Sequence, residues 1–144
     1  MLYKVSPKGV EAYIPLLREL IKREELRGEG VDRDLLLERL LDGRSFALAC
    51  FASPEHPIPV FVGVCREAHD DVRNLNVLWV DHMLVPHASE LRANGAVLKA
   101  DVAKLLPTYD RIMFHTNNPA LPRILDEIGI ISKETARLYE VGVK

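Results

Sequence analysis

Three apolar segments in the middle of the chain limit the fold more than any other feature of the sequence. They are Ser45–Ala52 (SFALACFA), Val60–Cys65 (VFVGVC) and Asn76–Val85 (NVLWVDHMLV), and each reads as a strand. The first two flank SPEHPIP, whose three prolines cannot lie in a central strand and therefore indicate a turn. The third has apolar residues on both faces, as expected for a strand that is covered on both sides. We therefore predict a sheet at the centre of the fold, with the polar stretch Arg66–Asn74 as a connecting loop.

Two helices are predicted before these strands. Apolar residues recur at helical spacing over Val10–Ile21, although Pro15 requires that this helix begins several residues earlier or bends. Asp32 is a candidate N-cap for a second helix, which carries five leucines between positions 35 and 41, and Gly43 is its candidate stop. The residues before the first helix, Ser6–Gly9, read as a turn-rich segment.

The remaining elements follow from the same apolar patterns and stop signals. They are a strand at Leu2–Val5, a helix that includes Ala96–Leu106, a strand at Arg111–His115, a helix at Leu121–Ile128 that Gly129 stops, and a last strand at Arg137–Val143. The predicted order is therefore β-α-α-β-β-β-α-β-α-β. No repeat, low-complexity tract or linker divides the chain, so we expect a single domain over residues 1–144.

The composition is that of an ordinary globular domain and excludes several classes of protein. The 144 residues include 19 basic and 21 acidic side chains, so the formal charge of −2 gives no electrostatic argument for nucleic acid or an anionic membrane. No apolar run approaches the roughly 20 residues needed to span a bilayer, and the first residues have no signal-peptide pattern. The five histidines and two cysteines lack the spacing of metal ligands. We therefore expect a cytoplasmic protein with no metal site, no nucleic-acid partner and no membrane partner.

The two cysteines, Cys50 and Cys65, are too few for a disulfide framework. If the strands around them form a hairpin centred on residues 55–59, the two thiols face each other across the strands. The alternative is a pair of buried, small apolar residues in a reducing compartment.

A spaced set of residues near the C-terminus points to a family. In the segment NNPALPRILDEIGI, Arg123 lies five residues after Asn118, and Gly129 lies eleven residues after Asn118. With the order of elements, this spacing resembles the GNAT superfamily of acetyl-CoA-dependent N-acyltransferases. The resemblance implies the GNAT fold, with helices on both sides of a mixed, mostly antiparallel sheet. In the family a tyrosine two residues after the Arg protonates the departing thiolate, and an aromatic residue follows the Gly. Here Leu125 and Ile130 stand at those positions, so the role of the tyrosine is vacant.

A second match to the family follows the third central strand. Leu84-Val85-Pro86 closes the strand, and RANGAV (92–97) resembles the family's phosphate-binding motif, although Val97 stands where a small residue is expected. The resemblance implies that the strand end pairs with the pantetheine arm of acetyl-CoA, while backbone amides at a helix N-terminus hold the pyrophosphate. The implied cofactor-binding residues are Met83, Leu84, Val85, Arg92, Ala93, Asn94, Gly95, Ala96, Val97 and Asn118.

The same segment has an alternative interpretation as helix. Ser89 could cap a helix that runs uninterrupted from Glu90 to Leu106, in which case no phosphate cradle exists. The pair Asn94-Gly95 favours a turn instead, because both residue types tolerate positive φ. We predict the turn.

Asp81 and His82 are the candidate catalytic residues. They interrupt the third apolar segment, on the strand that lines the transfer site in the family. An amine must lose a proton to attack a thioester, and a carboxylate or imidazole could take it. Asp81 is favoured because its position has the same parity along the strand as Trp79 and Met83, so that in a regular strand the three side chains share one face. The alternative is that one of the pair faces solvent and the other has a backbone partner, and His115 at the end of the next strand could face the same cleft or lie at its rim.

Two functions remain open from the sequence. The first is an N-acetyltransferase that uses acetyl-CoA and a small-molecule or protein amine as acceptor. The second is a GNAT-fold structural or interaction protein without the chemistry, because the chain also resembles the small, degenerate GNAT-like proteins encoded by phages. That likeness lies in the chain length, the strand that ends Leu84-Val85-Pro86 and the closing segment from Arg111 to Ile130. It implies a virion location, with other virion or assembly proteins as partners.

Overall fold

The computed structural model describes residues 2–26, 32–114, 120–133 and 141–142. In chain order its elements are β1 (Leu2–Val5), α1 (Pro7–Leu26), α2 (Arg33–Leu41), β2 (Phe46–Cys50), β3 (Phe61–Asp70), β4 (Leu75–Leu84), α3 (Ala88–Ala93), α4 (Gly95–Leu105), β5 (Arg111–Phe114) and α5 (Ala120–Glu127). This is the predicted order, apart from a third helix that is divided in two. Most of the predicted last strand, Arg137–Val143, lies outside the described residues.

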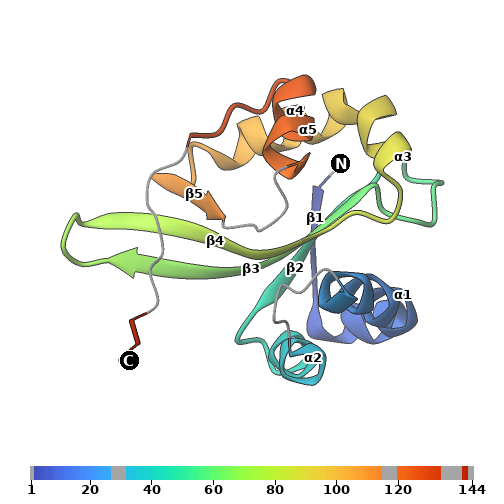
Figure 1. Cartoon of the computed structure of the whole chain (residues 1–144), viewed down its shortest axis with the longest axis horizontal. Coiled ribbons are helices and arrows are strands. Elements are labelled where there is room, and N and C mark those ends of the chain that lie inside the picture. The colour runs from blue at the N-terminus through green and yellow to red at the C-terminus, as the bar shows by residue number, and fades with distance from the viewer. Residues whose placement is uncertain (1, 27–31, 115–119, 134–140, 143–144) are drawn as a thin grey trace.

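A five-stranded sheet separates two layers of helices (Figure 1). The strands lie in the order β1-β2-β3-β4-β5, and all neighbours are antiparallel except β4 and β5, which are parallel. Helices α1 and α2 cover one face, whereas α3, α4 and α5 cover the other. The first face buries Val10, Leu17, Leu20, Ile21, Leu36, Leu37, Leu40, Ala47, Ala49, Val62, Val64 and Leu84. The second buries Cys50, Phe61, Leu91, Leu98 and Leu125, and beside them Leu48, Cys65, Leu78 and Val80.

The helix boundaries follow from capping residues. Helix α1 begins at Pro7, so the prediction of a turn over Ser6–Gly9 was wrong. The Ser6 hydroxyl accepts a hydrogen bond from the Gly9 amide (3.1 Å), and proline suits the first position of a helix, where no amide donor is needed. Asp32 caps α2 as predicted, because its carboxylate accepts from the Leu35 amide (3.0 Å). Gly43 lies just beyond α2 with φ of +81°, as predicted for a helix stop.

The register of the β2–β3 hairpin differs from the prediction. Cys50 pairs with Phe61 and Cys65 with Phe46, so the two cysteines are not cross-strand partners. Both thiols are buried and free, as in the alternative interpretation.

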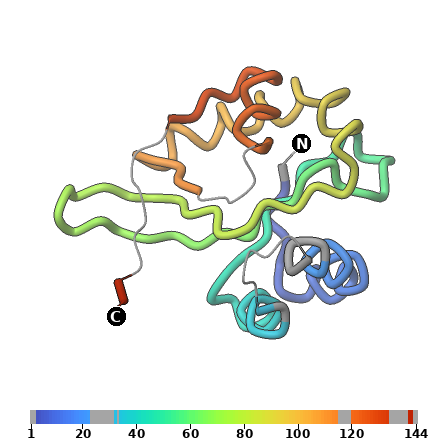
Figure 2. The backbone as a smooth tube through the Cα atoms, viewed as in Figure 1, coloured from blue at the N-terminus to red at the C-terminus, as the bar shows by residue number. Residues whose placement is uncertain are grey.

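The β3–β4 hairpin is longer than predicted. Residues 66–70, expected in a loop, continue β3 and pair with β4, so that the hairpin projects beyond the helices (Figure 2). Its turn is closed by Asp70, whose carboxylate accepts from the amides of Val72 and Arg73 (3.1 Å each), and by Asn74 at φ of 52°. The polar side chains of the extension are compatible with a strand here, because none of its five residues is buried and both faces remain in contact with water.

In the part of the chain that the structure describes, no helix is long and apolar enough to cross a membrane.

Candidate functional site

A β-bulge lies at the predicted catalytic pair. On one side of it Val80 pairs with Cys65, and on the other His82 pairs with Val64, so that Asp81 is the extra residue of β4. A bulge turns two successive side chains toward the same face of a sheet. Val64 is buried under α1 and α2, which assigns His82 to that face.

Asp81 lies on the same face, where it contacts Arg66, the residue two positions after Val64 on β3. The predicted parity of Asp81 with Trp79 therefore holds. The predicted parity with Met83 was wrong, because the bulge moves Met83 to the opposite face, beside the core residues under α4 and α5. The bulge thus places both candidate catalytic residues, Asp81 and His82, on one face of the sheet.

The parallel ladder between β4 and β5 is described as far as the bulge. Its last described pair is Val80 with Phe114, although β4 continues for four more residues to Leu84. Met83 and Leu84, predicted to contact pantetheine, pair with Gly63 and Val62 on the β3 side of this extension, and Val85 follows directly. His115 and Asn118, the other predicted residues of this region, lie outside the described residues.

Arg66 is a site residue that sequence reasoning missed. Its Nε donates to both carboxylate oxygens of Asp81, at 3.0 and 3.2 Å, and its guanidinium lies 5.4 Å from the centre of the Trp79 ring. The side chains of Arg66 and Asp81 are 38% and 21% exposed, so this ion pair is partly buried. Arg66 was placed in a loop, yet its spacing from Val62 and Val64 is the period of two that continues a strand.

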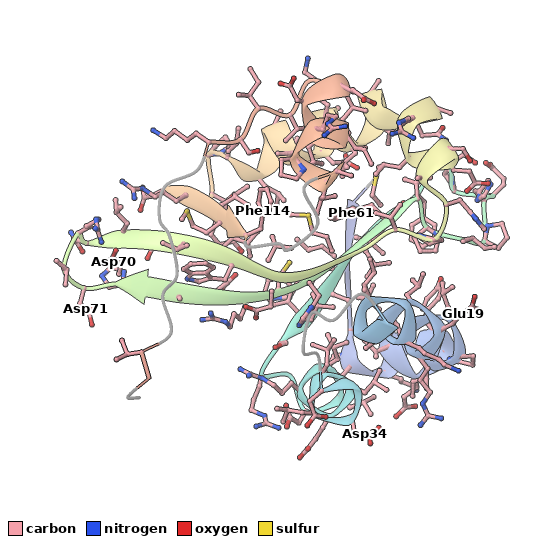
Figure 3. All side chains as sticks on the ribbon, viewed as in Figure 1. Glu19, Asp34, Phe61, Asp70, Asp71 and Phe114 are labelled. Atoms are coloured by element: carbon pink, nitrogen blue, oxygen red, sulfur yellow. The ribbon has the colours of Figure 1, made fainter. Side chains whose placement is uncertain are left out.

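The hairpin carries further ion pairs toward its tip. Asp70 pairs there with Arg73 at 2.9 Å, and Figure 3 shows Asp70 and Asp71 at this end of the molecule, far from α1 and α2. Phe61 and Phe114, in contrast, point toward the layer of α4 and α5. The tip is therefore a solvated, charged end, whereas the base of the hairpin contributes side chains to the hydrophobic cores on both faces of the sheet.

The predicted phosphate-binding turn is a helical joint instead. Helix residues lie on both sides of Asn94, which has φ of −111°, so the prediction of a turn at positive φ was wrong. The first helix begins at Ala88 with His87 in the N-cap position, not at a Ser89 cap. The interpretation as a helix from Glu90 to Leu106 is thus closer to the structure, apart from the break at Asn94.

This joint limits which amides of residues 93–97 are free to bind phosphate. The Asn94 amide donates to the Glu90 carbonyl and the Val97 amide to the Asn94 carbonyl, both at 3.0 Å. Their assignment to a pyrophosphate stays a prediction, as it does for Ala93 and Ala96. For a phosphate to reach them, these hydrogen bonds would first have to be exchanged.

Gly95 has a packing role that the sequence did not reveal. It is buried at the start of α4, and a Cβ added to it would lie 2.4 Å from Cγ2 and 2.6 Å from Cβ of Ile128, just beyond α5. The glycine thus allows the close approach of α4 to the end of α5.

Arg92, predicted to contact phosphate, is paired with a carboxylate. Its Nε donates to Glu127 of α5 at 3.0 Å, and both side chains are about half exposed. A surface pair of this kind contributes little to stability, typically below about 1 kcal/mol, so an anionic ligand could replace Glu127 at low cost.

Leu125 occupies the position of the family's tyrosine and belongs to the core. It is 4% exposed and packs in the cluster with Leu91, Leu98 and Phe61. Its carbonyl accepts from the Ile130 amide (2.8 Å), which together with Gly129 at φ of +86° ends the helix. A leucine here supplies packing and no proton.

The two thiols, of Cys50 and Cys65, are poor nucleophiles. Burial, with a smaller contribution from the Asp81 charge, raises the pKa of Cys65 to about 12. Burial also raises the pKa of Cys50 to about 11, and its thiol donates to the buried Asp101 carboxylate at 3.5 Å. Because the thiolate is the reactive form, covalent catalysis through either cysteine is not favoured. Among the described residues, no group of His, Cys, Asp and Glu could hold a metal ion.

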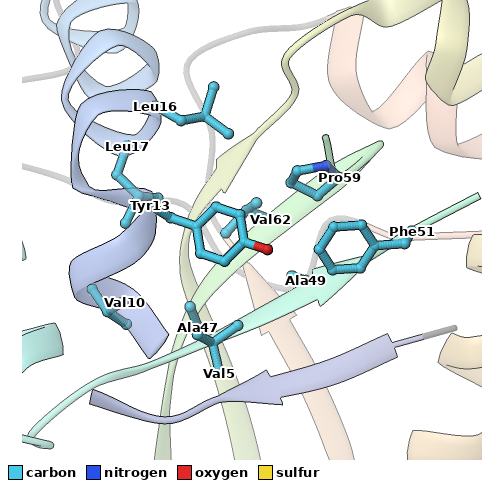
Figure 4. Close-up of a pocket in the computed structure, with 10 residues that line it drawn as sticks. All are labelled: Val5, Val10, Tyr13, Leu16, Leu17, Ala47, Ala49, Phe51, Pro59 and Val62. Carbon is cyan, nitrogen blue, oxygen red and sulfur yellow. The ribbon is translucent and has the colours of Figure 1, made fainter. Parts of the chain in front are cut away.

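A small apolar pocket lies between α1 and strands β1 to β3 (Figure 4). Its volume of about 20 Å³ is that of one water molecule, and Tyr13 is its sole lining residue with a polar side chain. The tyrosine ring faces Phe51 and Val62 across it. This pocket is too small for an acceptor, so the bulge in β4 remains the candidate site.

Comparison with known proteins identifies the fold. No family model matches the sequence, and no curated protein matches it. Among solved structures, a probable acetyltransferase has a TM-score of 0.68 at 12% identity, with 100% of this chain and 98% of that one covered. A ribosomal-protein-alanine N-acetyltransferase from Brucella melitensis biovar Abortus 2308 has 0.66 at 19%, with 99% of each chain covered. An aminoglycoside acetyltransferase from an uncultured soil metagenomic sample has 0.61 at 18%, with 100% of this chain and 98% of that one covered. The chain therefore has the GNAT acyl-CoA N-acyltransferase fold.

Proposed function

We propose that the protein transfers an acetyl group from acetyl-CoA to a primary amine. The observation that carries this proposal is the carboxylate of Asp81 at the bulge, directly after Val80, which belongs to the last described pair between β4 and β5. A base is needed where an acyl group would emerge between these strands. The solved structures similar in fold and named acetyltransferases support the proposal at the level of the reaction class.

The residues around the bulge in β4 are compatible with acetyl-CoA. The extension of β4 from Asp81 to Leu84 pairs with β3 on one side, and in this proposal the pantetheine arm would pair with its other edge. Met83, Leu84 and Val85 would bind this arm through the backbone, while Arg92 and the first turn of α4 would hold the pyrophosphate. When bound, acetyl-CoA supplies an activated acyl carbon and a thiol leaving group.

The transfer needs one proton taken from the acceptor and one given to the leaving group. The amine nitrogen attacks the thioester carbon, and the C–N bond forms as the C–S bond breaks. Asp81 or His82 takes the proton that the nitrogen loses, directly or through a water molecule. Since Leu125 has no proton to give, water protonates the departing thiolate, whose ordinary pKa near 8.5 makes it a tolerable leaving group. We expect this reaction to be slower than one assisted by a tyrosine.

Calorimetric titration with acetyl-CoA tests the proposal, followed by an assay of thiol release. We expect micromolar binding, weakened in Arg92→Gln, a surface substitution that leaves the fold intact. Asp81→Asn should bind acetyl-CoA normally and lower the rate of thiol release. Absence of binding up to about 1 mM acetyl-CoA by the folded protein would rule the proposal out.

A second candidate function is that of a GNAT-fold interaction protein without catalysis, such as a phage virion component. The observation that favours it is the packing at two motif positions. Leu125 is a core residue, and Gly95 is explained by Ile128 without any ligand. Its partners would be other virion or assembly proteins. A folded chain that binds no acetyl-CoA but co-assembles with such a protein would support this candidate.

A further inference from the structure

The side chains around the bulge form a charged shelf on the sheet face shared with α1 and α2. Arg66, Trp79 and Asp81 belong to it by direct contact. By strand register, Ala68, Val77, Arg111 and Met113 lie on the same face, since Ala68 pairs with Val77, Arg111 with Val77 and Met113 with Trp79. We call these seven residues the acceptor shelf.

The charge of the acceptor shelf is unsuited to a cationic ligand. Among the described strand residues on this face, it carries two guanidinium groups, from Arg66 and Arg111, and one carboxylate, from Asp81, with the His82 imidazole next to that carboxylate. Along β3 the next carboxylate on this face, that of Asp70, lies at the tip of the hairpin and is already paired with Arg73. An amine that also carries a negative charge is therefore favoured over a polyamine.

The contact between Arg66 and Asp81 sets the spacing of the ligand's charges. Arg66 Nε and Asp81 Oδ2 are 3.0 Å apart. A ligand that binds both side chains in place of this ion pair must therefore hold its own opposite charges close together. An α-amino carboxylate does so, because one carbon separates its ammonium and carboxylate groups. The ammonium would bind Asp81 and the carboxylate would take the Arg66 guanidinium, whose fork of donors suits two oxygens.

Trp79 makes this exchange inexpensive. Its ring supports the Arg66 guanidinium through a cation–π contact, so that the guanidinium can stay in place when Asp81 turns to a ligand. The ion pair itself is partly buried, so a ligand that replaces it must offer an opposite charge to each of its two members.

We propose that the acceptor shelf binds an α-amino carboxylate, with Arg66 holding its carboxylate and Asp81 its amine. As the substrate of acetyl transfer, this ligand rests on the proposed function, in which Asp81, next to the last described pair of the β4–β5 ladder, takes a proton from the amine. The binding of this ligand to the acceptor shelf does not depend on the proposed function. An amine without a carboxylate would leave Arg66 competing for Asp81 and should bind more weakly.

Trp79 is the single tryptophan of the chain, so its fluorescence reports on the shelf without any need for catalysis. The probes are glycine, L-leucine, L-phenylalanine and L-glutamate, together with L-leucinamide, which keeps the amine of leucine and lacks its carboxylate. We expect a saturable change with at least one of the amino acids. We also expect the Kd of leucinamide to be higher than that of leucine by about tenfold or more. Calorimetry with the same probes replaces fluorescence if the indole emission does not change.

Two variants make the assignment specific. Arg66→Gln should abolish the preference for the carboxylate. The matched control Arg73→Gln removes a guanidinium from the hairpin tip and should bind as the wild type does. Urea unfolding of both variants checks that the fold is retained.

The outcomes separate this inference from the proposed function. Binding of an amino acid without any thiol release from acetyl-CoA would overturn the proposed reaction and uphold the shelf as a binding site. Acetyl transfer to leucinamide as good as that to leucine would overturn the shelf and leave the reaction standing. Absence of saturable binding up to about 10 mM of every amino acid, or unchanged preference in Arg66→Gln, would also overturn the shelf.

Discussion

Substitution of Gly95 by alanine tests whether packing or a ligand explains this glycine. The added Cβ would lie 2.4 Å and 2.6 Å from two atoms of Ile128, about 1 Å inside ordinary carbon–carbon contact. The backbone does not require glycine, because Gly95 is not among the residues with positive φ. The substitution must therefore displace the end of α5 from α4.

Two opposing effects determine the size of the change. Alanine has the higher helix propensity, by at most about 1 kcal/mol. Overpacking of a buried contact costs about 1–3 kcal/mol. We expect the second effect to prevail, with a loss of about 1–2 kcal/mol in the free energy of unfolding and a fall of about 3–8 °C in Tm.

Urea unfolding of four variants measures these effects separately. Ala96→Gly, at the exposed next position of α4, gives the propensity difference alone. Gly95→Ala, Ile128→Gly and the double variant form a cycle, and removal of the Ile128 side chain should recover about 1 kcal/mol or more of the loss. A Gly95→Ala variant as stable as the wild type, or strictly additive effects, would refute the packing argument. Normal stability with loss of acetyl-CoA binding would instead assign the glycine to phosphate.

Three shorter predictions concern other contacts. Glu127→Gln frees Arg92 from its ion pair and should lower the Kd for acetyl-CoA about two- to fivefold by calorimetry, whereas an unchanged Kd would separate Arg92 from the cofactor. Asp32→Ala removes the α2 cap and should cost about 1 kcal/mol in urea unfolding, with Asp32→Asn as the conservative control. Because burial raises the pKa of Cys50 and Cys65 from 9.0 to about 11 and 12, both thiols should resist a thiol reagent at pH 8 until the chain unfolds. The stability contributed by these raised pKa values is complete below pH 9 and is lost toward pH 11–12, so the urea midpoint should fall over that window and fall less in Cys65→Ala.

Elements whose signals are local in sequence could be predicted. The order of helices and strands follows from apolar periodicity, and the cap at Asp32 and the stop at Gly43 follow from residue chemistry at helix ends. Even the missed start of α1 was signalled by Ser6 and Pro7, a capping residue followed by a first-turn proline. These features depend on neighbours within one turn of the chain, so tertiary context adds little to them.

Features that depend on the pairing of distant segments could not be predicted. The cross-strand partners of Cys50 and Cys65 depend on where the intervening loop folds back, and a shift in that point changes every pair. The role of Gly95 depends on Ile128, more than thirty residues later, and the partner of Asp81 depends on how far β3 extends. Composition carries no trace of such contacts.

The bulge in β4 affects both the packing of the core and the position of the candidate site. Val80 packs toward α4 while Leu84 packs toward α1 and α2, although the two are four positions apart and a regular strand would place both on one face. The extra residue at position 81 is therefore required by the core, with or without a function. A carboxylate at that position is not required by packing, nor is the guanidinium that meets it above Trp79. Since a protein that kept only the fold could place any small residue there, Arg66 and Asp81 are the residues whose substitution distinguishes an enzyme from a scaffold.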